Sequence, residues 1–142
     1  METFSTLMGF DFGTRSIGIA VGQSITKTAQ PLTAVTAIGD QPNWRHIASI
    51  IDEWKPDALI VGIPLNMEGE PLSVTQKAQD FADQLRERFN KPVFEADERL
   101  TTKEARAVLF KEKGFKGLEK SKIDALSAMF ILESWMRENL LN

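Results

Sequence analysis

The stretch LMGFDFGTRSIGIAVG, residues 7–22, decides the fold of this chain. Two apolar segments, residues 6–12 and 17–22, are separated by GTRS, whose residues are typical of a tight turn. The stretch therefore predicts a β-hairpin. Asp11 lies between two phenylalanines in the first segment, where burying its charge is costly unless another group compensates it. Asp11 is therefore expected to close the turn, to face a bound phosphate or to hold a metal ion.

Seven further segments have patterns typical of strands and helices. Short apolar runs predict buried strands, and apolar residues at helical spacing predict helices. The expected strands are residues 29–38, 57–63 and 91–97, and the expected helices are residues 43–55, 72–89, 101–113 and 121–141. The sequence therefore predicts an α/β fold with a five-stranded mixed sheet, three antiparallel strands followed by two parallel ones, with helices on both faces. No linker is visible, so residues 1–142 are expected to form one domain.

The composition excludes several kinds of chemistry. The 142 residues include no cysteine, which excludes disulfides and thiolate metal sites, and one histidine, His46, which is expected on a helix surface. The net charge is −3, no leader sequence is recognisable, and the apolar runs are too short to cross a bilayer. We therefore expect a cytoplasmic protein with no membrane partner, whose chemistry rests on carboxylates.

Positive charge is concentrated in residues 99–122. This segment has eight basic and three acidic residues, a local charge of +5. Local positive potential attracts polyanions even when the whole chain is acidic. The segment is therefore either a nucleic-acid-binding surface or a solvated helix face.

Three acidic residues are candidates for one site. Asp11 ends the first expected strand, Glu98 follows the last, and Asp124 is the single acid in an apolar run of the final helix. Ligands of α/β sheets bind at the carboxyl ends of strands, so parallel pairing of the first and last strands would bring these acids to one edge. Converging carboxylates need a cation, and oxygen ligands suit Mg²⁺ or Mn²⁺. Such a site supports attack of water on a phosphodiester.

Each acid also has a structural alternative. Asp11 could bond the backbone of the following turn. Asp124 could complete a capping box with Ser121 as the N-cap, and Glu98 could form a surface ion pair with a basic residue that follows it.

Four motifs, in order, resemble the YqgF (RuvX) family: FDFGTRSIGIAVG, IVGIPLNMEGE, DERLTT and KIDALSAMFILESW. The resemblance covers essentially the whole chain. It implies a ribonuclease H-like fold and a nuclease that processes the 5′ end of pre-16S ribosomal RNA, or a Holliday junction resolvase that acts on branched DNA. It also implies that Asp11, Glu98 and Asp124 are catalytic and bind one or two Mg²⁺ or Mn²⁺ ions.

The resemblance extends to the surroundings of these acids. The wider resolvase group often has a fourth acid one helical turn before the last, where this chain has Ser121. The expected partners are precursor ribosomal RNA or branched DNA, and pre-ribosomal particles, for a monomer or weak dimer. The implied substrate-binding residues are Gly13, Thr14, Arg15, Asn66, Arg99, Thr101, Thr102, Arg106 and Lys122.

Two other functions remain open from the sequence. A non-catalytic RNA-binding or ribosome assembly factor would use the basic segment alone and bind with a steep salt dependence. A small ATPase is the other, because DFGT and its hairpin also resemble the phosphate loop of actin-like folds. Those folds close two lobes on ATP, whereas 142 residues supply one.

Overall fold

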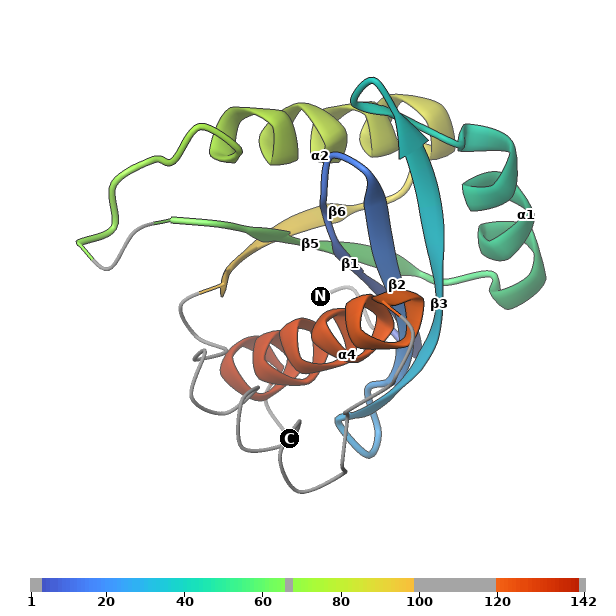
Figure 1. Cartoon of the computed structure of the whole chain (residues 1–142). Helices are drawn as coiled ribbons and strands as arrows, with labels where there is room; N and C mark the ends of the chain where they lie inside the picture. Colours follow the sequence, from blue (N-terminus) through green and yellow to red (C-terminus); the bar gives the residue numbers. More distant parts are fainter. Residues whose placement is uncertain (1–3, 66–67, 99–119, 141–142) are drawn as a thin grey trace.

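A mixed sheet with helices on both faces forms the centre of the molecule (Figure 1). The computed structural model describes residues 4–65, 68–98 and 120–140. Within these residues the strand order is β4-β3-β2-β1-β5-β6. The strands are β1 (Thr6–Asp11), β2 (Ser16–Gln23), β3 (Thr28–Ile38), β4 (Gln41–Pro42), β5 (Ala58–Ile63) and β6 (Val93–Asp97). The helices are α1 (Trp44–Trp54), α2 (Thr75–Phe89) and α4 (Lys120–Asn139).

The sheet differs from the prediction in two respects. The described residues contain six strands rather than five, because the two-residue strand β4 pairs with the end of β3. Two residues are too few to show a strand periodicity, and one of them is a proline. The expected pairing of the first strand with the last is also wrong, since β5 lies between β1 and β6. Both neighbours of β5 run parallel to it, so the carboxyl ends of all three strands still lie at one edge.

The predicted hairpin is confirmed. β1 pairs antiparallel with β2 from Thr6 to Asp11, and β2 pairs antiparallel with β3. Side chains alternate across a strand, and Gly9 faces Leu132 of α4, so Asp11 shares that face. Phe10 belongs to the core on the other face. The expected burial of Asp11 among phenylalanines is therefore wrong, because their rings lie on the opposite side of the sheet.

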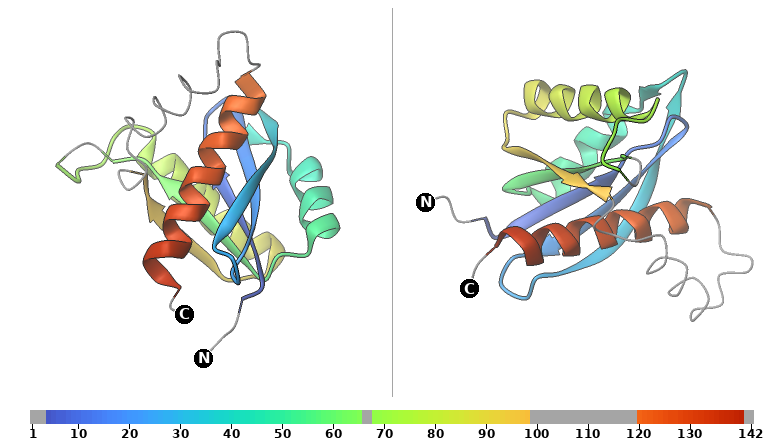
Figure 2. Two further views of the ribbon diagram at one scale, coloured as in Figure 1. Left: turned by 90° about the horizontal axis from the view of Figure 1, so that it is seen from below. Right: turned by 90° about the vertical axis from the view of Figure 1, so that its left-hand side faces the viewer.

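Each face of the sheet has its own core. Figure 2 shows α1 and α2 on one side of the sheet and α4 on the other. The first core is mainly aliphatic and contains an aromatic group, in which Phe10, Phe12 and Trp44 are arranged around Phe81 of α2. The second joins β1 and β5 to Ile131, Leu132, Trp135 and Met136 of α4.

Helix boundaries follow local capping chemistry. Asn43 is the N-cap of α1, and its side chain accepts a hydrogen bond from the backbone N–H of His46 at 3.2 Å. His46 is exposed, as predicted. α2 begins at Thr75 rather than at residue 72, because the Thr75 hydroxyl bonds the preceding loop at Pro64 and Leu72.

Two of the predicted helices, residues 101–113 and 121–141, lie in the C-terminal third of the chain. The predicted helix 101–113 lies outside the described residues. The final helix is present, and Ser121 is one of its helical residues. Ser121 is therefore not its N-cap, and the capping-box interpretation of Asp124 is wrong. No helix in the described ranges is both long and apolar enough to cross a membrane.

Asp57 ties the start of β1 to the start of β5. Its Oδ2 accepts hydrogen bonds from the backbone N–H groups of Ser5 at 2.7 Å and Thr6 at 3.0 Å. The Thr6 and then the Ser5 N–H groups lower the pKa of Asp57 below its usual 3.8. A lowered pKa stabilises the fold above the unfolded-state pKa, and this stabilisation is lost as the pH falls through the folded-state pKa.

We expect Asp57→Asn to lower the free energy of unfolding at pH 7 by about 1 kcal/mol, because a neutral amide accepts these bonds less strongly. Urea denaturation at pH 7 and pH 3 measures this, and the deficit is expected to shrink at pH 3. Asp52→Asn is the control, since Asp52 forms only a solvent-exposed ion pair with Lys55 at 3.7 Å. Equal losses for the two variants at pH 7 would contradict the role of Asp57.

Candidate active site

Asp11 lies between two glycines at the carboxyl end of β1. In the strand registers it is opposite Gly18 of β2 and Gly62 of β5. Neither glycine has a side chain, so both positions beside the carboxylate are open to groups from other elements. Asp124 approaches on one side and Glu98 on the other.

On the β2 side, the backbone of α4 rests directly on the sheet. A Cβ atom added to Gly18 would lie 1.9 Å from the carbonyl oxygen of Asp124. Real Cβ atoms do not come that close, so this approach requires glycine at position 18. Gly18 therefore brings Asp124 to the strand next to Asp11.

The carboxylate of Asp124 is held by the same strand. The hydroxyl of Ser16 donates a hydrogen bond to Oδ2 of Asp124. Ser16 and Gly18 are two residues apart on β2, so they lie on the same face of the sheet. β2 thus contacts Asp124 twice, at its backbone and at its side chain.

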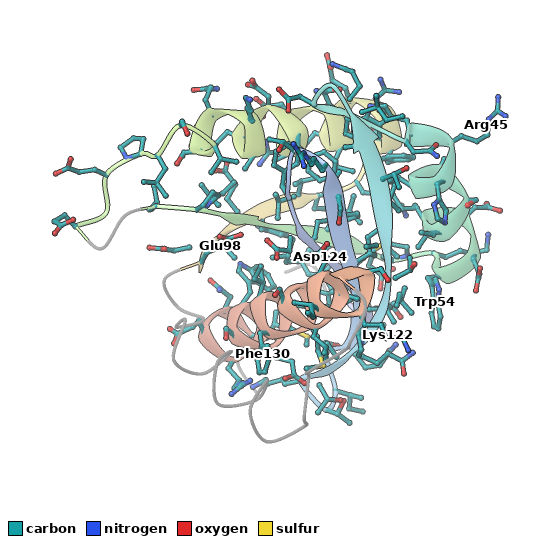
Figure 3. The ribbon with its side chains drawn as sticks, in the orientation of Figure 1. Arg45, Trp54, Glu98, Lys122, Asp124 and Phe130 are labelled. Carbon is teal, nitrogen blue, oxygen red and sulfur yellow. The ribbon has the colours of Figure 1, made fainter. Side chains whose placement is uncertain are left out.

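On the β5 side, Gly62 makes room for Glu98, which follows the end of β6. A Cβ atom added to Gly62 would lie 3.0 Å from both Cγ and Oε1 of Glu98, and 2.7 Å from Cδ1 of Ile131. The Oε1 atom of Glu98 is buried. Figure 3 shows Glu98 and Asp124 on the side of the sheet that α4 covers.

The three acids share an edge of the sheet, but their carboxylates do not form a closed cluster. Neighbouring strands lie about 4.8 Å apart, so the residues above β2, β1 and β5 spread over roughly 10 Å. In keeping with this spacing, no group of three acidic or histidine side chains in the described ranges is arranged to hold a metal ion. The backbones of the three acids therefore lie close to one another, but their carboxylates do not form a ready-made ligand shell.

The predicted phosphate-binding residues of the hairpin lie in the loop between β1 and β2. Arg15 is exposed, and its carbonyl oxygen accepts a hydrogen bond from the N–H of Ala37 at 2.9 Å. Thr14 is half-buried. A Cβ atom added to Gly13 would lie 2.5 Å from the carbonyl oxygen of Ser16, so Gly13 allows this turn to close tightly.

Of the other predicted substrate-binding residues, only Lys122 lies in the described part of the chain. Lys122 is exposed near the start of α4, and in the view of Figure 3 Asp124 lies between Glu98 and Lys122. Most of the basic segment lies outside the described residues, and so do the predicted residues Asn66, Arg99, Thr101, Thr102 and Arg106.

Three further residues shape the site, and the sequence predicts none of these roles. Gly18 lies directly beneath the backbone of α4, because a Cβ atom there would meet the Asp124 carbonyl oxygen. Gly62 was visible as a glycine inside a buried strand, a pattern that often marks close approach of another group. Ser16 carried no such signal, because its partner is 108 residues away.

The fold of this chain is similar to the ribonuclease H-like fold of Holliday junction resolvases whose structures are known. T. thermophilus RuvC in complex with a Holliday junction substrate matches with a TM-score of 0.59, covering 97% of this chain and 98% of that chain at 15% identity. The fowlpox virus resolvase in complex with Holliday junction DNA matches with a TM-score of 0.58, covering 96% and 99%, also at 15% identity. At these identities the likeness concerns the fold.

Sequence relatives are much more similar. A Haemophilus ducreyi protein named "Putative pre-16S rRNA nuclease" is 57% identical over 135 residues, covering 95% of this chain and 98% of its own length. A Shewanella oneidensis protein of the same name is 48% identical, covering 94% and 95%. The family model "RuvX: Holliday junction resolvase" matches residues 5–138. The chain therefore belongs to the RuvX family, which confirms the resemblance seen in its motifs.

Proposed function

We propose that this protein is a metal-dependent endonuclease that hydrolyses phosphodiester bonds in the 5′ end processing of pre-16S ribosomal RNA. The observation that carries the proposal is the register of Asp11 between Gly18 and Gly62, which places Asp124 on one side and Glu98 on the other. The names of relatives at 48–57% identity support a ribosomal RNA substrate.

The residues fit a hard divalent cation. Asp11 lies in β1, Glu98 directly after β6 and Asp124 in α4, and they offer only carboxylate oxygens, the donors that Mg²⁺ and Mn²⁺ prefer. These three residues would hold one or two ions. When bound, such an ion lowers the pKa of a coordinated water and stabilises charge on the phosphate oxygens.

The chain itself positions these groups. Asp11 is fixed by strand pairing on both sides, Asp124 by its contacts with β2, and Glu98 by packing against Gly62. Rigid placement of charged groups lowers the reorganisation needed when the substrate reacts.

The loop between β1 and β2 supplies the substrate contact. Arg15 is exposed and follows Asp11 by four residues. Guanidinium groups bind phosphate oxygens through paired, charge-assisted hydrogen bonds. Thr14 and Gly13 complete this loop, and Lys122 adds positive charge from α4. The roles of Asn66, Arg99, Thr101, Thr102 and Arg106 in holding substrate follow from the family motifs.

One experiment distinguishes an RNA substrate, a branched DNA substrate and a non-catalytic RNA-binding role. An end-labelled pre-16S leader RNA and a four-way DNA junction are incubated with the full chain in Mg²⁺ or Mn²⁺, with and without excess EDTA. We expect metal-dependent cleavage of the RNA and an intact junction. The negative control is the triple variant with Asp11→Asn, Glu98→Gln and Asp124→Asn.

The other outcomes have definite meanings. Preferential cleavage of the junction would replace the RNA substrate with branched DNA, the substrate in the family description. Tight RNA binding without cleavage, equal in wild type and triple variant, would indicate a non-catalytic RNA-binding factor. Cleavage that survives EDTA would exclude metal dependence.

A further inference from the structure

We propose that Ser16 is a positioning residue of the active site, whose hydroxyl sets the orientation of the Asp124 carboxylate. The inference rests on the proposed function, because it assigns to Asp124 the role of a metal ligand. The observation that carries it is the hydrogen bond from Ser16 Oγ to Asp124 Oδ2, which links the first residue of β2 to α4.

Ser16 is itself rigidly placed. It is paired with Thr36 in the register of β2 with β3, and the preceding carbonyl, of Arg15, accepts a bond from Ala37 N–H at 2.9 Å. The turn before it is tight, because Gly13 approaches the Ser16 carbonyl too closely for any side chain. The hydroxyl therefore projects from a backbone that is fixed on both sides.

The two contacts of β2 with Asp124 have separate effects. Packing on Gly18 fixes the position of the Asp124 backbone, but a backbone contact does not by itself determine the rotamer of the side chain. The Ser16 hydroxyl, two residues earlier on the same face, selects the rotamer in which Oδ2 points to β2. A carboxylate that is both anchored and oriented is preorganised to bind a cation.

The bond is compatible with metal binding. A carboxylate has about four acceptor positions, and the Ser16 hydroxyl occupies one of those on Oδ2. Hydrogen bonds to ligating carboxylates orient them, and their loss commonly costs about 10- to 100-fold in metal affinity or activity. The spacing Ser-x-Gly at positions 16–18 would thus hold both parts of Asp124, because Ser16 orients its carboxylate and Gly18 admits its backbone.

The test compares Ser16→Thr with Ser16→Val, two side chains of nearly equal shape that differ in the hydroxyl. Mn²⁺ binding to the full chain is titrated by electron paramagnetic resonance, and RNA cleavage is measured under steady-state conditions. We expect the valine variant to bind Mn²⁺ about 10-fold more weakly and to lose kcat while KM for RNA is unchanged. The threonine variant is expected to retain both properties.

Ser49→Ala is the control, since the exposed Ser49 hydroxyl donates to the carbonyl oxygen of His46 on α1, away from the acids. It is expected to leave Mn²⁺ binding and cleavage unchanged. Equal Mn²⁺ affinity and kcat in the threonine and valine variants would overturn the inference. If Asp124→Asn still weakens Mn²⁺ binding in that case, the proposed function stands without it. If wild type and Asp124→Asn bind Mn²⁺ alike, both fall.

Discussion

Asp11→Asn is expected to lower kcat for RNA cleavage by at least about 10³-fold, a loss of about 4 kcal/mol of transition-state stabilisation. Asp11 is the central acid of the three, flanked in register by the glycines that admit Asp124 and Glu98. Asparagine keeps the shape of the side chain but removes the charge that a divalent cation requires. Single-turnover cleavage of the leader RNA in Mn²⁺ measures the effect.

The fold should survive this change. Asp11 has a half-buried side chain at the end of β1, and a neutral amide relieves repulsion among nearby acids. We therefore expect a melting temperature equal to or slightly above that of wild type. Asp83→Asn is the control, because Asp83 pairs with Arg86 on the exposed surface of α2, on the opposite side of the sheet. An Asp11→Asn protein that cuts at the wild-type rate would refute the three-acid mechanism.

Gly18→Ala is expected to damage both stability and activity. The added methyl group would lie 1.9 Å from the Asp124 carbonyl oxygen, which is backbone and cannot rotate away. α4 must therefore move outward, at a cost of about 2–3 kcal/mol in the free energy of unfolding. A displacement of about 1 Å at a reacting group lowers the rate by about 10²-fold. Urea denaturation and cleavage well below the melting temperature separate the two effects.

Gly39→Asn serves as the control for this substitution. Gly39 has a φ of +57°, and a Cβ atom there would meet no atom within 4 Å. Asparagine tolerates this left-handed conformation, so stability is expected to change by less than about 0.5 kcal/mol. If Gly18→Ala matches wild type in stability, α4 does not depend on this contact.

Features that depend on residues close together in the sequence were predictable, whereas features that depend on contacts between distant segments were not. The hairpin, the buried parallel strands and α1 were predictable, because a turn, an apolar run and a helical spacing each show within a few neighbouring residues. The insertion of β5 between β1 and β6 was not, since strand order depends on contacts between distant segments. A pair of residues such as Gln41–Pro42 carries no pattern at all.

The same limit applies to the candidate site. Asp11, Glu98 and Asp124 stood out because acids in apolar surroundings or at strand ends are conspicuous in a sequence. The face on which Asp11 lies was misjudged, because adjacent residues in a strand point to opposite sides and Phe10 therefore says little about its surroundings. The supporting roles of Ser16 and Gly62 depend on partners in other elements and become visible only in three dimensions.

The contact between Gly18 and Asp124 also determines when the site can exist. It joins residues 106 positions apart, and α4 is synthesised after every strand of the described sheet. A nascent chain can pair β1 with β2 and β5 while the third acid is still missing. Under the proposed function, cleavage therefore requires that α4 has docked, and a chain in which α4 is not yet synthesised or is undocked would lack Asp124 beside Asp11.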